Sequence, residues 1–462
     1  MEVLTKEFRW AIIAAAGIAG ILILVKAPEL LVAMLVSGAR FIQMSFRIFG
    51  LDVDRRTFGV VGAVVFLPIV VLFFIVRLVQ TREMLPMIGR RNYPFMVVAI
   101  ALGVLLLIGL TYTHAPQYGT QKTGEYFIFG MAPMLLAVVL MRDGAAVRRF
   151  VFWIVLILVL NMSVVTVYAL VTGGGITLRS FSSGEEQYGM DIPGHAGLGA
   201  ASVLLMIILL GVAGCSRRLR WRVLPILLLP VVVFYLLYSG SRSNLVAFAF
   251  VAVYGFSVAY RDRRGLLLIG LVVLVVAGSV FFMSGEEAMI ERMSPRGWFD
   301  PETRAGGGYG RLRMLEKCLE FYKTALVLGH GTGGWTYLAN GVDVYDYPHN
   351  MFGEILVENG IVGLLLLLGL WFLVSRRVWH CVRGKRPGSE IYAVGVMGGG
   401  VLIMELLNGM AHFGIAHHSC SLLLFSGIIL RASFLLEEEA QPDEIHPELE
   451  ADSLHASLTV RA

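Results

Sequence analysis

The sequence predicts an all-α integral membrane protein with about twelve transmembrane helices and one long outer loop. Of its 462 residues, 57% are hydrophobic and only 15% are charged, and the mean hydropathy is +0.75. A soluble domain is about 45–50% apolar and about 25% charged. The chain therefore has too little polar surface for a water-soluble protein of its size, which excludes soluble enzymes and nucleic-acid-binding proteins.

Apolar runs recur along the chain at the length that a bilayer requires. A membrane-spanning helix needs roughly 20 mostly apolar residues. Runs of about this size lie near residues 10–25, 58–79, 94–112, 125–141, 150–171, 196–214, 223–239, 243–260, 265–284, 351–374, 391–413 and 417–435. They predict twelve crossings.

The distribution of basic residues gives an independent test, because Lys and Arg accumulate in short cytoplasmic loops. Every second loop is basic: Arg82, Arg90 and Arg91; Arg142, Arg148 and Arg149; Arg217, Arg218, Arg220 and Arg222; Arg261, Arg263 and Arg264; Arg376, Arg377, Arg383, Lys385 and Arg386. With Lys6 and Arg9, this alternation predicts both termini in the cytoplasm and residues 285–350 outside.

The predicted organisation has four parts. Residues 1–284 hold transmembrane helices 1–9, residues 285–350 form the long outer loop, and residues 351–436 hold helices 10–12. The tail, residues 437–462, is acidic and poor in aromatic residues, which predicts a disordered cytoplasmic segment. The first run is predicted to be an uncleaved anchor, with a secretory signal as the alternative. Residues 28–49, interrupted by Arg40 and Arg47, are predicted to form an outer interfacial or half-inserted helix.

The end of the long loop carries the strongest candidate for chemistry, His349. Pro348 is favoured at a first helical position, so a helix is predicted to start here with His349 and Asn350 in its first turn. A helix N-terminus suits an anion such as phosphate and keeps an imidazole neutral, which is the form that a general base requires. The alternative is an interfacial histidine that only hydrogen-bonds at a helix end.

Two carboxylates follow on the same predicted helix face. Glu354 and Glu358 lie at intervals of four from Asn350, and only 14 apolar residues follow Gly360. The span must therefore include residues before Glu358 or break at Asn359–Gly360. Glu354 is an ordinary partner for the helix dipole. For Glu358, a structural hydrogen bond to a neighbouring helix is favoured over a contact with substrate.

Three arginines are candidates for phosphate binding, because the guanidinium group offers planar, paired donors. Arg242 lies in the tight outer turn 239–243, where snorkelling to the headgroups is the alternative role. Arg311 and Arg313 open an amphipathic helical pattern in the long loop, so one of the two is expected to be solvated. The glycine-dense segment 329–334 lacks the context of a phosphate-binding loop and predicts a tight turn. His412, His417 and His418 have no acidic or cysteine partner in their loop, so we expect neither a metal nor another cofactor.

These motifs, taken in order, resemble the O-antigen ligase and O-antigen polymerase superfamily of bacterial envelope glycosyltransferases. The resemblance rests on Ser241-Arg242, Gly310-Arg311-Leu312, Gly329-His330-Gly331-Thr332-Gly333, Pro348-His349-Asn350 and Glu358-Asn359-Gly360-Ile361-Val362-Gly363. It implies a protein of the bacterial inner membrane that transfers a glycan from an undecaprenyl-diphosphate carrier to an acceptor hydroxyl on the periplasmic side. No nucleotide sugar or metal is implied.

By the same resemblance, Arg242 and Arg311 hold the donor diphosphate and His349 takes the proton of the acceptor hydroxyl. An aromatic residue often follows the loop arginine by four positions in that family, and Leu315 stands there in this chain, so the choice between Arg311 and Arg313 stays open. The predicted substrate-binding set is Arg242, Arg311, Arg313, Asn350 and Glu358, with His349 catalytic.

The resemblance leaves the acceptor open. A ligase uses the lipid A core and a polymerase uses another lipid-linked repeat; we favour a ligase-like enzyme. A transporter of lipid-linked glycans is the alternative from another class. Transporters often show repeated halves, whereas the polar loop residues here concentrate in the second half of the chain, which favours an enzyme.

Overall fold

The computed structural model describes residues 26–37, 92–171, 195–216, 219–239, 241–260, 270, 308–383, 385–411 and 415–440. Every regular element within these residues is a helix, in agreement with the predicted fold class. The predicted runs at 10–25 and 58–79, almost all of the run at 265–284 and nearly all of the acidic tail lie outside the described residues.

The helices cover most of the described chain. They are α2 (Pro28–Ser37), α5 (Tyr93–Gly109), α6 (Pro116–Glu125), the π-helix η2 (Tyr126–Met131), α7 (Ala132–Leu140), α8 (Gly144–Val171), α11 (His195–Cys215), α12 (Leu219–Tyr238), α13 (Arg242–Ala259), α17 (Gly308–Tyr322), α18 (Gly334–Asn340), α19 (Met351–Arg383), α20 (Glu390–Ala411) and α21 (Ile415–Ala440). Among the described residues, six helices are long and apolar enough to cross a membrane, and α5 and part of α13 are shorter apolar helices.

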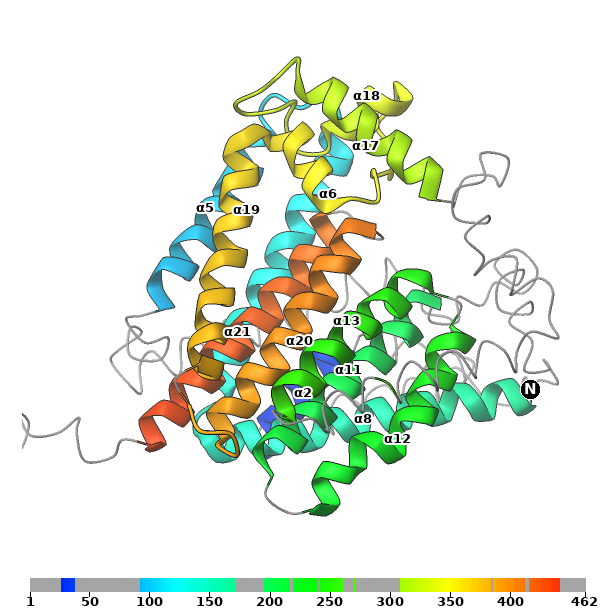
Figure 1. Ribbon diagram of the computed structural model, residues 1–462. Helices are drawn as coiled ribbons and strands as arrows, with labels where there is room; N and C mark the ends of the chain where they lie inside the picture. Colours follow the sequence, from blue (N-terminus) through cyan, green and yellow to red (C-terminus); the bar gives the residue numbers. More distant parts are fainter. Residues whose placement is uncertain are drawn as a thin grey trace, which may run out of the picture.

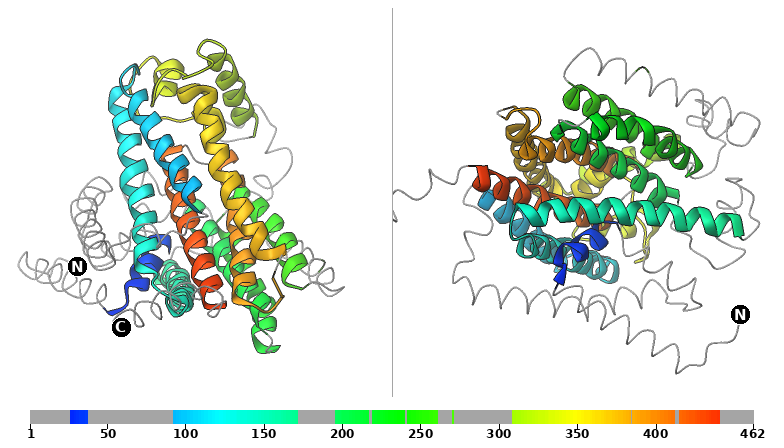
Figure 2. Two further views of the ribbon diagram at one scale, coloured as in Figure 1. Left: turned by 90° about the vertical axis from the view of Figure 1, so that its left-hand side faces the viewer. Right: turned by 90° about the horizontal axis from the view of Figure 1, so that it is seen from below.

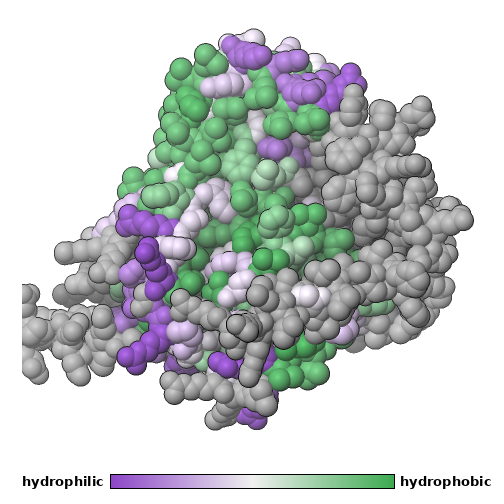
Figure 3. All heavy atoms as spheres, viewed as in Figure 1, coloured by the Kyte–Doolittle hydropathy of each residue, from purple (hydrophilic) through white to green (hydrophobic). Residues whose placement is uncertain are grey.

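The surface also fits a multi-pass membrane protein. Large apolar side chains are exposed in rows along α5 and α19, including Val97, Ile100 and Val104 on the first and Leu365 and Phe372 on the second. Soluble monomers rarely expose contiguous apolar surface on this scale. The end of the molecule that carries α17 and α18 is called here the loop end. Figure 3 shows hydrophilic groups at the loop end and near the opposite end, with hydrophobic surface between them.

Helix α20 lies at the centre of the arrangement, packed against α11, α13, α19 and α21 (Figure 1). Its glycines at 398–400 bring these neighbours close: a Cβ added at Gly399 would lie 2.1 Å from the Tyr254 hydroxyl. Small residues allow helices in a bilayer to approach one another closely. Helix α20 is therefore packed closely against its neighbours through these glycines.

Helix α8 is arranged differently from the upright helices. Figure 2 shows α8 almost along its axis in the view where α5, α7 and α19 stand upright, so it runs across their ends opposite to the loop end. The crossing predicted for residues 150–171 therefore stays a prediction, as do the twelve-span topology and the outward position of the long loop.

The position of α2 conflicts with one combination of predictions. Glu29 of α2 is buried and accepts hydrogen bonds from Arg149, with the shortest contact, to Nη2, at 2.7 Å. Arg149 belongs to a predicted cytoplasmic loop, and α2 packs on α8 at the end away from α17 and α18 (Figure 1). The sequence predicted both residues 28–37 and the long loop on the outer side, and the structure places α2 at the end opposite to α17 and α18, so these two predictions cannot both hold. The buried carboxylate of Glu29 is stabilised at that end by its cationic partner.

The topology can be tested with cysteines placed at exposed positions. In a protein whose native Cys215, Cys318, Cys381 and Cys420 are replaced, Val342→Cys should react with an impermeant thiol reagent in intact cells. Pro387→Cys, in the last predicted cytoplasmic loop, should react only after the membrane is permeabilised. Labelling of position 387 in intact cells would contradict the predicted orientation.

Candidate active site

Helix α19 is broken near its loop end. Gly360 has φ 63° and ψ −161°, which is not a helical conformation. In a regular helix the amides of residues 361 and 362 would bond to the carbonyls of residues 357 and 358. The break removes both of these hydrogen bonds, and buried backbone groups that are left unpaired are costly. The structure shows both features that the sequence offered as alternatives, because α19 begins before Glu358 and is also non-helical at Gly360.

A glycine-rich segment fills this break. It supplies a partner to each of the four backbone groups that the break releases: Ile361 N to Leu326 O at 3.0 Å, Val362 N to Val327 O at 3.3 Å, His330 N to Val357 O at 2.9 Å and Gly331 N to Glu358 O at 2.9 Å. Two lost helical hydrogen bonds are thus replaced by four bonds to the segment 326–331. The amides of His330 and Gly331 are used in this way and do not form a free phosphate cradle.

Glycine is required on both sides of this contact. Gly329 and Gly360 both have positive φ, and a Cβ at Gly360 would lie 2.2 Å from Val327 O. A Cβ at Gly329 would lie 2.4 Å from the Glu358 carbonyl carbon. The glycine-dense motif therefore allows two backbones to meet, and it positions the loop-end half of α19, residues 351–359.

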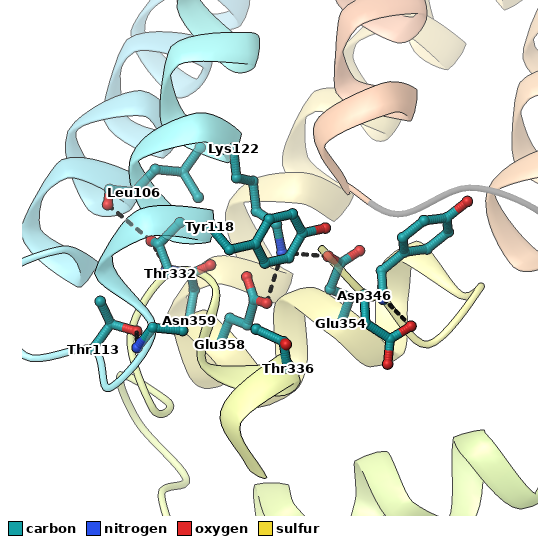
Figure 4. A network of polar contacts seen from close by, with 12 residues as sticks. Leu106, Thr113, Tyr118, Lys122, Thr332, Thr336, Asp346, Glu354, Glu358 and Asn359 are labelled. Atoms are coloured by element: carbon teal, nitrogen blue, oxygen red, sulfur yellow. Dashed lines mark hydrogen bonds and ion pairs between the residues drawn. The ribbon is translucent and has the colours of Figure 1, made fainter. Parts of the chain in front are cut away.

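A buried charged cluster fixes the same half-helix to α6 (Figure 4). Lys122 Nζ donates hydrogen bonds to Glu354 and, at 2.6 Å, to Glu358 Oε1, and all three side chains are fully buried. The Tyr118 ring lies over the ammonium group, 4.6 Å from its centroid. Glu358 thus makes the structural contact that the sequence favoured, although as part of an ion pair.

The sequence did not identify Lys122 as a site residue, because it lies between the apolar runs at 94–112 and 125–141 that were predicted to span the membrane. Helix α6 begins at Pro116, so the predicted span at 125–141 starts earlier and includes Lys122. The available signal was the pair Glu354 and Glu358, because two carboxylates on one face of a span require a cation nearby.

The start of α19 corrects the predicted helix boundary. The helix begins at Met351, and Asn350 is its N-cap: Asn350 Oδ1 accepts from Gly353 N at 2.9 Å. His349 precedes the cap, is half-buried and has φ 53°. Pro348, His349 and Asn350 therefore lie before the first turn, because the asparagine side chain is the better cap. A left-handed conformation in a residue other than glycine is uncommon and is often found at functional sites.

The last turns of α20 connect His349 to the start of α13. Asn350 Nδ2 donates to Met410 O at 3.3 Å, and Asn408 Nδ2 donates to Asn244 Oδ1 at 3.3 Å. Asn244 lies in the first turn of α13, which begins at Arg242. The His349 and Arg242 motifs, more than a hundred residues apart in the chain, are thus attached to the same helix end.

Helix α17 brings the second arginine motif to the same region. A Cβ at Gly353, in the first turn of α19, would lie 3.0 Å from Cys318 Sγ and 3.4 Å from Leu315 Cδ1. Arg311 lies in the first turn of α17, one helical turn before Leu315, and the Arg313 side chain is exposed. Burial raises the pKa of the Cys318 thiol to about 12, so Cys318 is protonated at neutral pH and is not a nucleophile.

The metal prediction concerns residues that the structure only partly covers. Among the residues that it describes, no group of three His, Cys, Asp or Glu side chains could hold a metal ion. His412 and the side chains of His417 and His418 lie outside that part of the chain.

Comparison with known proteins supports the resemblance seen in the motifs. Residues 231–368 match the family described as O-antigen ligase. The match covers the Arg242, Arg311 and His349 motifs together with the glycine-rich segment and the break at Gly360. A search of curated proteins finds no match. The family match supports the superfamily that the motifs resemble and a membrane glycosyltransferase-type activity.

The contact at the break predicts the effect of Gly360→Ala. The new methyl group would meet Val327 O, and a positive φ alone costs an alanine of order 1 kcal/mol. The thermal unfolding temperature of the detergent-purified variant should fall clearly. Gly341→Ala is the matched control, because Gly341 also has a positive φ (73°) but its Cβ would meet nothing within 4 Å. Equal losses in the two variants would show that the Val327 contact contributes nothing.

The charged cluster predicts a large effect of Lys122→Met. It leaves two buried carboxylates without a cation, which typically costs about 3–5 kcal/mol. The yield and melting temperature of folded protein should fall, and adding Glu354→Gln and Glu358→Gln should restore much of the loss. Lys317→Met, at an exposed position of α17, should have little effect. A Lys122→Met protein as stable as wild type would contradict the role assigned to this cluster.

Proposed function

We propose that this chain, matched to the O-antigen ligase family over residues 231–368, transfers a glycan from an undecaprenyl-diphosphate carrier to an acceptor hydroxyl. The reaction takes place at the periplasmic face of the bacterial inner membrane, and the acceptor is a sugar of the lipid A core. In the same superfamily a polymerase would join the glycan to another lipid-linked repeat by the same chemistry.

The observation that carries this proposal is the shared attachment of two motifs to the end of α20. Asn350 bonds to Met410 O, and Asn408 bonds to Asn244 in the first turn of α13. The turn with a candidate base and the helix start with a candidate phosphate-binding arginine are therefore held in one region. A glycosyl transfer requires a base for the acceptor and positive charge for the leaving diphosphate.

In the proposed reaction, the acceptor oxygen attacks the anomeric carbon of the donor sugar. Its proton passes to a ring nitrogen of His349. The bond between the anomeric carbon and the phosphate oxygen breaks, and undecaprenyl diphosphate leaves with both electrons of that bond. Arg242 and Arg311 stabilise the negative charge that develops on the diphosphate.

The remaining predicted site residues have supporting roles in this proposal. Arg313 is exposed, which favours Arg311 as the second phosphate ligand. Asn350 caps α19 and bonds to Met410 O, so it positions His349. Glu358 is bonded to Lys122 and holds the loop-end half of α19 rather than contacting substrate.

The proposal predicts a severe defect in His349→Ala. Loss of a general base typically costs about 100-fold to 10,000-fold in rate. The assay measures transfer by the purified protein from an undecaprenyl-diphosphate-linked glycan to lipid A core, with a second lipid-linked repeat as the alternative acceptor. Near-normal transfer by folded His349→Ala would exclude His349 as the general base. Product formed only with the second lipid-linked repeat as acceptor would identify a polymerase.

The arginines are tested by substitutions that keep the charge. Arg242→Lys and Arg311→Lys should both be strongly impaired, because lysine loses the forked donor geometry. Arg313→Lys is the matched control and should transfer normally. Full activity of both test variants would exclude a diphosphate clamp, and loss of wild-type transfer in EDTA would indicate a metal requirement.

A further inference from the structure

A row of aromatic rings leads from α6 to His349. The ring centroids of Tyr347 and His349 are 4.5 Å apart, those of Tyr345 and Tyr347 are 6.0 Å apart, and those of Tyr118 and Tyr345 are 5.2 Å apart. Tyr118 is buried, whereas Tyr347 and His349 are half-buried and Tyr345 is 46% exposed. The row therefore begins inside the bundle and reaches the surface beside the candidate base.

The backbone that carries the row is held firmly on the side of α6. Both oxygens of Asp343 accept hydrogen bonds from the start of α6, from Gln117 N at 2.7 Å and Tyr118 N at 3.1 Å. The segment that bears Tyr345 and Tyr347 is thus anchored to the helix that bears Tyr118.

Contacts within the loop hold the other side of the segment. Thr336 of α18 donates to Val344 O at 2.8 Å. The Asp346 carboxylate accepts from Asn340 Nδ2 at 2.8 Å and from Tyr347 N at 2.9 Å. Rings on such a braced segment can meet a ligand at little cost in conformational entropy.

Packing alone does not account for the exposed ring. Trp335, a larger aromatic residue of the same loop, packs on Phe321 and is 2% exposed. Tyr345 instead presents nearly half of its surface at the loop end. Exposed aromatic rings on a braced loop beside a reactive group are typical of ligand-binding surfaces.

We propose that Tyr345 and Tyr347 form a binding subsite for the glycan acceptor, at the sugar ring next to the one that carries the reacting hydroxyl. This inference rests on the proposed function. One face of a pyranose ring exposes C–H bonds that pack against an aromatic ring, while its hydroxyls require hydrogen-bond partners. The tyrosine rings offer the apolar face, and the Asp346 carboxylate beside them is an acceptor for a hydroxyl.

The geometry assigns this subsite to the acceptor rather than to the donor. The acceptor hydroxyl must come within hydrogen-bond distance of the His349 ring, so the sugar that bears it lies against His349. The neighbouring sugar then lies about one sugar width away, which matches the 4.5 and 6.0 Å steps from His349 to Tyr347 and on to Tyr345. The donor diphosphate is placed elsewhere, at the starts of α13 and α17.

The test compares Tyr345→Leu with Tyr345→Phe in purified, reconstituted protein. Leucine removes the ring, so KM for lipid A core should rise roughly 3-fold to 10-fold, the effect of one aromatic contact. The kcat and the KM for the lipid-linked donor should stay unchanged. Phenylalanine keeps the ring and should behave like wild type. Tyr337→Leu is the matched control, because Tyr337 is 42% exposed but stacks on His114 outside the row.

A second measurement uses the unaltered protein and does not depend on turnover. Tetranitromethane modifies exposed tyrosines, and saturating lipid A core should slow the nitration of Tyr345 but not that of Tyr337. Any one of three results would overturn the subsite. These are an unchanged KM for the acceptor in folded Tyr345→Leu, an equal rise of this KM in Tyr337→Leu, and a nitration rate of Tyr345 that the acceptor does not change. Failure of the proposed function has a different signature, which is transfer that persists in His349→Ala.

Discussion

The arrangement depends on the exchange of backbone hydrogen bonds at Gly360. Once α19 breaks there, its loop-end half, residues 351–359, is no longer held by the helix that follows it. The segment 326–331 replaces the lost bonds, and the contact is close enough that Gly329 and Gly360 have no room for a side chain. The position of His349 follows from this half-helix, because Asn350 caps its first turn.

Two further contacts hold the half-helix, and each has a different physical character. Lys122 bonds to both buried glutamates and fixes the half-helix to α6. The low dielectric constant of the interior strengthens the attraction between these charges, so separating them is costly. At the other side, Asn350 bonds to the end of α20, which also bonds to Asn244 of α13. The candidate base is therefore positioned by contacts with both α6 and α20, which suits the proposed alignment of a donor and an acceptor.

Composition and local pattern were sufficient to predict part of this account. The apolar runs predicted the helical membrane class, and the short run after Gly360 indicated either a longer span or a break at that residue, both of which α19 shows. The motifs led to the superfamily that residues 231–368 match. Each of these inferences uses residues that are close together in the chain or a spacing that a family preserves.

The contacts that assemble the site could not be predicted in this way. Lys122 is 232 and 236 residues from Glu354 and Glu358, and Asn408 is 164 residues from Asn244. No local pattern identifies such partners, so Lys122 was left between two predicted spans and the end of the bundle at which α2 packs was not predicted. The start of α19 was predicted three residues too early. Pro348 was taken as the first helical residue, whereas Asn350 caps the helix and Met351 is its first residue.

The central claim is that the starts of α13, α17 and α19 enclose one site for a lipid-linked diphosphate and its acceptor. The most direct measurement is an electron cryomicroscopy structure of the protein in lipid nanodiscs with undecaprenyl diphosphate. The account predicts that the diphosphate lies between Arg242 and Arg311, one sugar away from the His349 ring. A diphosphate bound at the opposite end of the bundle, near α2 and α8, would contradict it.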